Sequence, residues 1–319
     1  MRLRRHLTPR DAASVDLTTT VGSVTLRSPI MIASGTGGYG AELAPYVDLA
    51  SIGAVVAKSL APFAWAGNPA PRLHPTTAGM LNAVGLQGPG VAAWRDGELP
   101  ALLATGATVV ASIWGRTIDD YAAAADALAE LPASVVAVEV NLSCPNLKGK
   151  GMFAQSPTDT EAAMAATASC RRPRWAKLTA AVTNLVEIAA AARAGGASAL
   201  TLINTVPGLA IDIDARSPVL GNGSGGLSGP AIHPVAVKAV WDVHASMTDM
   251  PLVGVGGVAG ATDVVELLMA GASAVQVGTA NFADPSTTVR IQAALARWCA
   301  AHDVGAVRDL VGVAHVARR

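Results

Sequence analysis

Residues 135–146 read Val-Val-Ala-Val-Glu-Val-Asn-Leu-Ser-Cys-Pro-Asn. The segment begins as an apolar run rich in β-branched residues, which is typical of a strand, and it ends in a turn that contains proline. Around this turn lie two amides, Asn141 and Asn146, and the thiol of Cys144. Each amide offers a donor and an acceptor to a polar planar substrate, and a thiolate can accept a proton. A lone cysteine after a strand is more often a small buried apolar residue, so the surroundings must decide between the two interpretations.

Seven other short runs share the apolar, β-branched character of this strand. Together with residues 135–143 they form a series of eight, at residues 29–34, 54–59, 108–115, 135–143, 175–179, 199–205, 251–257 and 274–279. Their apolarity is continuous and does not alternate, which is typical of parallel strands that are buried on both faces.

Helical patterns separate most of these runs. They lie at residues 117–131, 159–170, 184–194, 233–247 and 262–270, and residues 284–302 predict a closing helix. Asp159 and Thr262 are the expected N-caps of two helices, and Gly195-Gly196 and Gly271 follow two helix ends. Eight strands that alternate with helices predict a single (β/α)8 TIM barrel, with an open doubly wound sheet as the alternative.

The N-terminal segments complete this architecture. Residues 1–15 have four arginines among the first ten positions and predict a basic tail rather than a secretory signal, so residues 16–319 would form the barrel. Residues 16–26, with Gly22 at the turn, predict a short β-hairpin that plugs the barrel from below.

The C-terminal face of the expected barrel has a ring of polar residues and glycines. The strands end in these residues: Ser34, Lys58, Ser59, Ser112, Asn141, Lys177, Asn204, Thr205, Gly256, Gly257, Gly278 and Thr279. Two long connections, residues 60–100 and 207–230, emerge at the same face, where barrel enzymes bind their ligands. Any one of these residues could be a turn former or a filler, but a barrel without a ligand needs no such ring. We therefore expect a binding site at this face.

Composition narrows the kind of ligand. The chain has 319 residues, 51% of them apolar, and its 23 basic residues balance 23 acidic ones, so no net field favours nucleic acid or a membrane surface. No apolar run reaches the roughly 18 residues that span a bilayer. Cys144, Cys170 and Cys299 are too far apart for a disulfide framework, a zinc site or an iron–sulfur cluster. These features favour a small-molecule ligand and a reducing cytoplasm.

Glycine-rich segments predict a phosphate-binding site but not an NAD-binding site. Residues 254–259 and 277–281 each lead from a strand toward a helix, where backbone N–H groups can hold a phosphate. Residues 254–259 also match the dinucleotide pattern, but Gln276 stands where that pattern needs an acidic residue. Residues 221–226 match the pattern without a preceding strand, so we expect a flexible lid there.

The chain resembles the class 1 dihydroorotate dehydrogenases, flavin enzymes of pyrimidine biosynthesis. The active-site motif of that family is similar to residues 141–146 here, Asn-Leu-Ser-Cys-Pro-Asn. Other blocks that look like the family's follow in the same order, at residues 33–36, 58–59, 67–72, 79–87, 177–178, 203–205, 225–230 and 278–282. Each block alone is weak, but the combination is specific.

This resemblance implies FMN across the mouth of the barrel. The family pattern places these residues against the cofactor: Ser34, Lys58, Ser59, Ser112, Asn141, Lys177, Ile203 and Gly229. It places Gly256, Gly257, Gly278 and Thr279 at the phosphate. A lysine such as Lys177 suits the negative charge of a reduced flavin.

The resemblance also implies a site for dihydroorotate and its product orotate. Its residues would be Lys58, Asn82, Ala83, Val84, Gly85, Leu86, Asn141, Asn146, Asn204 and Thr205. The amides would bind the pyrimidine edge, and Lys58 the carboxylate. Cys144 would be the base that removes the C5 proton while hydride leaves C6 for the flavin. The membrane-associated class 2 enzymes have serine at this position, so Cys144 favours class 1.

The fate of the electrons depends on the subclass. Residues 79–87 and 146–151 look more like the NAD-linked class 1B than the fumarate-using class 1A. Class 1B implies a homodimer that joins a second subunit, with FAD and a [2Fe–2S] cluster, in a heterotetramer. Two further alternatives are a barrel like the FMN domain of dihydropyrimidine dehydrogenase and a non-catalytic barrel that binds a phosphorylated ligand.

Four residues at three places depart from the family pattern. Trp114 stands where the family usually has a small residue, Pro75 where it often has glutamate, and Ala180-Ala181 where Pro-Asn is common. These departures bear more on the choice of electron acceptor than on the binding of the pyrimidine.

Overall fold

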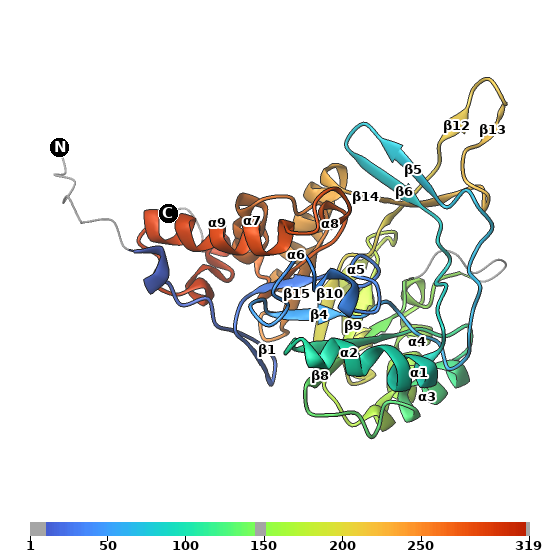
Figure 1. Ribbon diagram of the computed structural model, residues 1–319, viewed down its shortest axis with the longest axis horizontal. Coiled ribbons are helices and arrows are strands. Elements are labelled where there is room, and N and C mark those ends of the chain that lie inside the picture. Colours follow the sequence, from blue (N-terminus) through green and yellow to red (C-terminus); the bar gives the residue numbers. More distant parts are fainter. Residues whose placement is uncertain (1–10, 144–150, 317–319) are drawn as a thin grey trace.

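The fold is a closed barrel of eight parallel strands. The computed structural model describes residues 11–143 and 151–316. In order around the barrel the strands are β3 (Ile30–Ile32), β4 (Ala54–Val56), β7 (Val109–Ile113), β8 (Val135–Asn141), β9 (Arg174–Leu178), β10 (Ala199–Leu202), β15 (Leu252–Val255) and β16 (Ala274–Val277). All neighbouring strands are parallel, and β16 pairs with β3 to close the ring (Figure 1). The predicted barrel is confirmed, and the open-sheet alternative is wrong.

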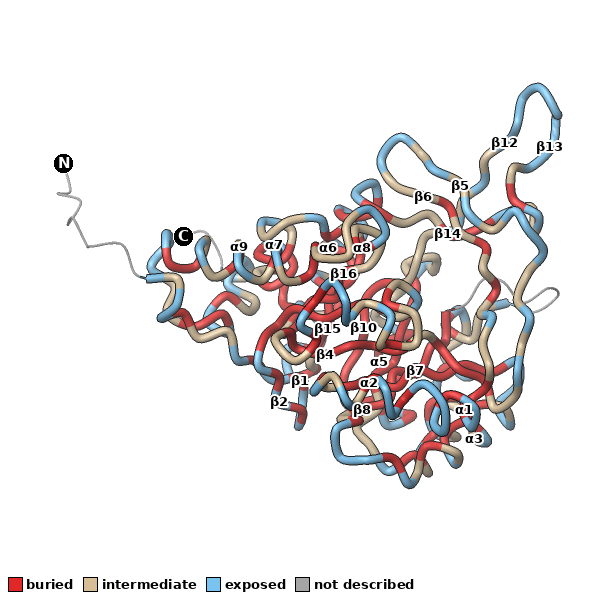
Figure 2. The backbone as a smooth tube through the Cα atoms, in the orientation of Figure 1, coloured by how far each residue is buried: buried red, intermediate tan, exposed pale blue. Residues whose placement is uncertain are grey.

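Alternating side chains divide each strand between two cores. In β9, Trp175 joins an inner core at the lower end of the barrel, whereas Ala176 and Leu178 join the outer core between strands and helices. Both cores exclude water, as the buried centre of Figure 2 shows, so the strands are apolar on both faces. Polar side chains enter the interior above the inner core, where β8 contributes Glu139 and β9 contributes Lys177.

A hairpin closes the lower end of the barrel. Strands β1 (Thr19–Val21) and β2 (Val24–Leu26) pair in antiparallel fashion around Gly22, whose φ of +60° suits glycine. Val21, Val24 and Leu26 are buried against inner-core residues such as Met31 and Trp175. The predicted plug is confirmed.

Helices cover the outside of the barrel. They are α2 (Leu99–Ala104), α3 (Ile118–Asp126), α4 (Pro157–Ala166), α5 (Leu185–Ala194), α6 (His233–Ser246), α7 (Ala261–Ala270) and α9 (Thr287–Ala301), with the short α1 (Val91–Ala93), α8 (Ala280–Ala283) and a π-helical turn, η3 (Trp94–Glu98). Single 3-10 turns are η1 (Ala12–Ser14), η2 (Ala41–Leu43), η4 (Phe153–Gln155), η5 (Ala168–Cys170), η6 (Pro230–Ile232), η7 (Val307–Leu310) and η8 (Val313–His315).

Two predicted N-caps are wrong. The N-cap of helix α4 is Ser156, whose side chain accepts a hydrogen bond from the backbone N–H of Asp159 at 3.3 Å. The N-cap of helix α7 is Gly260, and the carboxylate of Asp263 accepts a hydrogen bond from the Gly260 N–H at 2.8 Å. In both helices an acidic residue lies inside the first turn, where it suits the positive end of the helix dipole, and a small residue takes the cap. The predicted ends at Gly195 and Gly271 are confirmed.

The two long connections build a cap over the C-terminal face. Strands β5 (Leu73–Thr76), β6 (Gly79–Asn82), β11 (Val206–Gly208) and β14 (Gly225–Ser228) form one sheet in the order β11-β14-β6-β5. A hairpin of β12 (Ile211–Asp212) and β13 (Ser217–Pro218) projects from it (Figure 1). The expected flexible lid at residues 221–226 is wrong in part, because Gly225 and Gly226 are buried within β14.

One helical segment was not predicted. Residues 91–104 form α1, η3 and α2, although Gly97 and Pro100 made this stretch resemble a loop. Pro100 lies in the first turn of α2, where a missing N–H has no consequence.

Among the described residues, no helix is both long and apolar enough to cross a membrane. The expected division into a tail at residues 1–15 and a barrel from residue 16 stays a prediction.

Candidate active site

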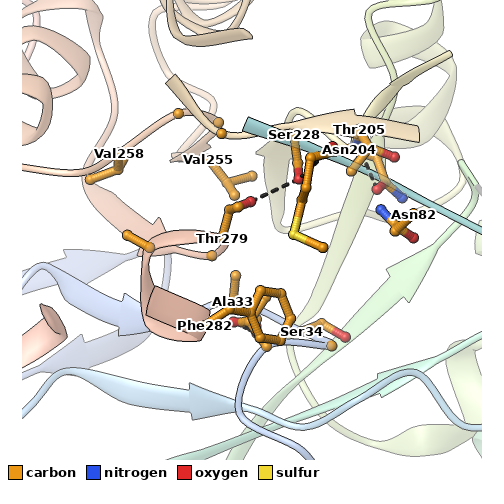
Figure 3. A pocket seen from close by; sticks show the side chains of 18 of the residues that line it. Ala33, Ser34, Asn82, Asn204, Thr205, Ser228, Val255, Val258, Thr279 and Phe282 are labelled. Carbon is orange, nitrogen blue, oxygen red and sulfur yellow. Dashed lines mark hydrogen bonds between the residues drawn. The ribbon is translucent and has the colours of Figure 1, made fainter. Parts of the chain in front are cut away.

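The strand ends surround a cavity of about 550 Å³ beneath the cap. That volume is within the range of small-molecule sites, roughly 300–1,000 Å³. The predicted site residues that line it are Ser34, Lys58, Ser59, Asn82, Val84, Gly85, Leu86, Asn141, Lys177, Ile203, Asn204, Thr205, Gly229, Gly256, Gly257, Gly278 and Thr279. Figure 3 shows Asn82, Asn204 and Thr205 on one side of the cavity and Thr279 and Val258 on the other.

Of the other predicted site residues, two lie behind this lining and two lie outside the described residues. Ser112 and Ala83 are fully buried behind it. Cys144 and Asn146 lie outside the described residues. The residue that precedes them, Ser143, is buried, and its hydroxyl accepts a hydrogen bond from the Asn204 amide at 2.9 Å.

A hydroxyl network joins the ends of four strands, β3, β4, β7 and β8, under the cavity. Ser59 is its centre, because its Oγ lies 2.8 Å from the Ser112 Oγ and accepts the Asn141 Nδ2–H at 3.1 Å. The Ser34 Oγ lies 3.3 Å from the same atom. Ser112 therefore lies behind Ser59 and not in the cavity wall, and its expected contact with the cofactor stays a prediction.

A second polar network holds the amides that face the cavity. The Asn141 Oδ1 accepts hydrogen bonds from Asn204 Nδ2 at 3.3 Å and from the Ser143 hydroxyl at 3.2 Å. Tyr121 donates its hydroxyl to the Asn141 backbone carbonyl at 2.8 Å. The amide groups consequently have fixed orientations, which a site needs if it is to recognise the edge of a planar ring by hydrogen bonds.

Sequence reasoning missed the residue below Lys177. Glu139 is fully buried in the barrel interior, and its Oε2 accepts hydrogen bonds from the Thr201 hydroxyl at 3.0 Å and the Gln276 amide at 2.8 Å. Its Oε1 lies 3.5 Å from the Lys177 Nζ. The signal was a charged residue within the apolar run at residues 135–140, because buried carboxylates are rare without partners.

Two glycine turns form the opposite wall. Gly256 and Gly257 have φ of +141° and +69°, and a Cβ on Gly257 would lie 2.6 Å from the His233 Cβ. The ring of His233 donates from Nδ1 to the Gly256 carbonyl at 2.9 Å and lies 3.1 Å from Glu266 through Nε2, so α6 and α7 fix the turn.

Hydroxyl donors lie on the same side of the cavity as these turns. The Thr279 hydroxyl donates to the Ser228 Oγ at 2.8 Å (Figure 3). Glycine backbone and hydroxyls in the cavity wall suit a phosphate, while the buried cation of Lys177 and the amides suit a polar ring. The residues present therefore fit a flavin mononucleotide.

A strap, residues 65–68, holds the loop at residues 82–86. Three successive carbonyls of the loop accept hydrogen bonds from the strap. Asn68 donates its side-chain and backbone N–H groups to Ala83 and Val84, both at 3.1 Å, and Trp65 donates its indole N–H to Gly85 at 3.0 Å. The loop's backbone is thus fixed from outside the cavity.

Tyr39 holds the residue that directly follows this loop. Tyr39 donates its hydroxyl to the Gln87 carbonyl at 3.0 Å. Burial, with a smaller contribution from Glu42, raises the pKa of Tyr39 to about 12, so this hydroxyl stays a donor at physiological pH.

The other cysteines lie away from the cavity. Cys170 and Cys299 are buried, and burial raises the pKa of both thiols. They therefore remain protonated at neutral pH and behave as apolar packing residues. Among the residues that the structure describes, no group of three or more His, Cys, Asp or Glu side chains could hold a metal ion.

Known proteins resemble this chain over almost its whole length. A family model described as dihydroorotate dehydrogenase matches residues 16–298. A protein of Pelobacter propionicus is 46% identical over 301 residues, which cover 93% of this chain and 98% of the relative. One of Geobacter sulfurreducens is 44% identical over 94% of this chain and 99% of the relative. Both are named dihydroorotate dehydrogenase B (NAD(+)), catalytic subunit.

Proposed function

The chain belongs to the dihydroorotate dehydrogenase family, and we propose that it oxidises dihydroorotate to orotate in pyrimidine biosynthesis as the catalytic subunit of an NAD-linked enzyme. The observation that supports this most is the convergence of Lys58, Asn141, Lys177 and Asn204 on one cavity opposite the glycine turns. The lysines and asparagines can bind a pyrimidine that has a carboxylate group, and the glycine turns can bind a phosphate.

In this proposal FMN occupies the cavity. Gly256, Gly257, Gly278 and Thr279 hold its phosphate, and Lys177 stabilises negative charge on its ring. The remaining contacts come from Ser34, Lys58, Ser59, Asn141, Ile203 and Gly229, with Ser112 behind Ser59. The bound flavin supplies a hydride acceptor.

The proposed substrate site lies between the loop and the amides. Asn82, Val84, Gly85, Leu86 and Thr205 line the same cavity as Asn141 and Asn204. Asn146 completes the set of amides, and Ala83 supports the loop from behind. Lys58 pairs with the substrate carboxylate, and the fixed amide groups orient the ring so that its C6 hydrogen faces the flavin.

Cys144 is the proposed base. It directly follows Ser143, whose hydroxyl is hydrogen-bonded to Asn204 and Asn141. The residue before Cys144 therefore has a fixed position in the site. Its thiolate removes the C5 proton, which balances the loss of hydride from C6 and leaves the C5–C6 double bond of orotate.

The electrons then leave through a partner. We propose a homodimer of this chain that binds an electron-transfer subunit with FAD and a [2Fe–2S] cluster, in line with the words "catalytic subunit" in the names of the relatives.

An anaerobic titration tests the function. Purified protein with bound FMN is mixed with dihydroorotate, and we expect the flavin absorbance to bleach with about one substrate per site. Bleaching by dihydrouracil but not by dihydroorotate would assign a dihydropyrimidine dehydrogenase-like activity instead. A colourless protein that binds no flavin would contradict the proposal.

A further inference from the structure

Three aromatic side chains form a cluster behind the proposed substrate loop. Phe63, Trp65 and Trp114 contact one another in pairs, with ring centroids 6.0–6.2 Å apart. The planes of each pair meet at 69–80°, the edge-to-face arrangement that aromatic rings prefer. Trp114 is almost completely buried and follows β7, so this aromatic cluster stands on a barrel strand.

A cation covers the outer side of the aromatic cluster. The guanidinium carbon of Arg116 lies 4.2 Å from the Phe63 ring centroid and 5.4 Å from that of Trp65. Asp120 holds this arginine through an ion pair of 3.4 Å. The cluster is therefore braced between the barrel and the first turn of α3.

One polar atom connects the aromatic cluster to the cavity. The Trp65 indole N–H donates to the carbonyl of Gly85, and Gly85 and Leu86 line the cavity whereas Trp65 does not. Leu86 has a φ of +60°, a conformation that a residue with a side chain adopts only when its surroundings impose it. The bond from Trp65 fixes the carbonyl of the preceding residue.

We infer that Phe63, Trp65 and Trp114 position the substrate loop, so that Trp65 sets the affinity for the pyrimidine without touching it. This inference rests on the proposed function, because it assumes that residues 82–86 bind dihydroorotate and orotate. Trp65 is a positioning residue, and Trp114 is the buried support that keeps its indole N–H directed at Gly85. A cluster that only filled space would need the rings but not the indole nitrogen.

Trp65→Phe separates these two roles, because phenylalanine keeps a ring and loses the donor. The measurement is the dissociation constant of orotate, followed by the change in flavin absorbance, together with FMN content and the melting temperature. We expect orotate to bind about 5- to 10-fold more weakly, the effect of one lost hydrogen bond, with FMN content unchanged. Trp298→Phe is the matched control, since Trp298 is half-buried, stacks on His302 and does not line the cavity.

A second variant covers the case in which Trp65→Phe fails to fold. Arg116→Met removes the exposed cation over Trp65, and we expect orotate to bind about 2-fold more weakly with FMN retained. Wild-type orotate affinity in folded Trp65→Phe overturns the inference, as does wild-type affinity in Arg116→Met if Trp65→Phe does not fold. Failure of the wild-type protein itself to bind orotate would instead contradict the proposed function.

Discussion

The Nζ atom of Lys177 lies 3.5 Å from Oε1 of Glu139, and both side chains are buried inside the barrel. Thr201 and Gln276 bind the other carboxylate oxygen, so four strands contribute to one polar layer beneath the cavity. Lys177 also lines the cavity, and Glu139 therefore neutralises the cation from below while leaving it directed at the proposed flavin. A buried pair of this kind is weak evidence for stability, but removal of one partner leaves an isolated charge.

The first prediction concerns this pair. Lys177→Met should lower the free energy of unfolding by about 3–5 kcal/mol, because the carboxylate of Glu139 would stay buried without its cation. Urea denaturation of the flavin-free protein measures the effect.

The double variant Lys177→Met/Glu139→Gln separates stability from chemistry. It should regain most of the lost stability, since no buried charge remains. Reduction of the flavin by dihydroorotate should remain slow in both variants, because neither has the cation that stabilises the reduced ring. Equal stability of the single and double variants would show that the two side chains are not coupled.

The second prediction concerns the glycine turn. Gly257→Ala should greatly reduce FMN content, because the new Cβ would lie 2.6 Å from the His233 Cβ and the φ of +69° disfavours alanine. Gly260→Ala, three residues further along, is the control, because a Cβ at Gly260 would lie 3.9 Å from its nearest neighbours and the backbone there is extended. FMN content is read from the absorbance of the purified proteins, and a yellow Gly257→Ala protein with full occupancy would remove the turn from the phosphate site.

The barrel could be predicted because its pattern is local. Each strand is a short run buried on both faces, and the run at 135–140 shows this in its sequence alone. The N-caps were missed because Asp159 and Thr262 are also common capping residues, and only the folded backbone shows that Ser156 and Gly260 hold the cap positions. The helices within residues 91–104 were not predicted, because Gly97 and Pro100 have low helix propensity and made the segment resemble a loop.

The strand pattern predicted the site where a residue ends a barrel strand. Lys58, Asn141 and Lys177 met at the cavity because parallel strands bring their carboxyl ends to one face. Glu139 and Trp65 were not predicted to matter, because their importance comes from partners distant in sequence: Gln276 is 137 positions from Glu139, and Gly85 is 20 from Trp65. Such pairings depend on the closed barrel and the folded cap.

The third prediction concerns the proposed base. Cys144→Ala should retain FMN and slow reduction of the flavin by dihydroorotate by about 10²-fold or more, the usual contribution of a positioned base. In the wild type the rate should rise with pH as the thiol ionises, since a free cysteine has a pKa of about 8.5. Stopped-flow absorbance measures the rate.

The two buried cysteines provide the controls. Cys170→Ala and Cys299→Ala should leave the rate unchanged, because both thiols are buried and their raised pKa keeps them protonated. For the same reason iodoacetamide at pH 8 should modify Cys144 before either of them. A Cys144→Ala protein that reduces its flavin at the wild-type rate would require another base.

The last prediction concerns the electron acceptor. The two glycine-rich segments that match a dinucleotide pattern fold in ways that do not suit NAD. Residues 254–259 do lead from β15 to α7, but Gln276, which replaces the required acidic residue, is buried and donates to Glu139 at 2.8 Å. Residues 221–226 lead into strand β14 and not into a helix.

We therefore expect the isolated chain to oxidise dihydroorotate with an artificial dye, and to reduce NAD only after the electron-transfer subunit is added. The increase in absorbance at the wavelength of NADH measures this directly. Rapid NAD reduction by the chain alone would contradict the prediction, whereas turnover with fumarate in the absence of a partner would place the chain with the class 1A enzymes.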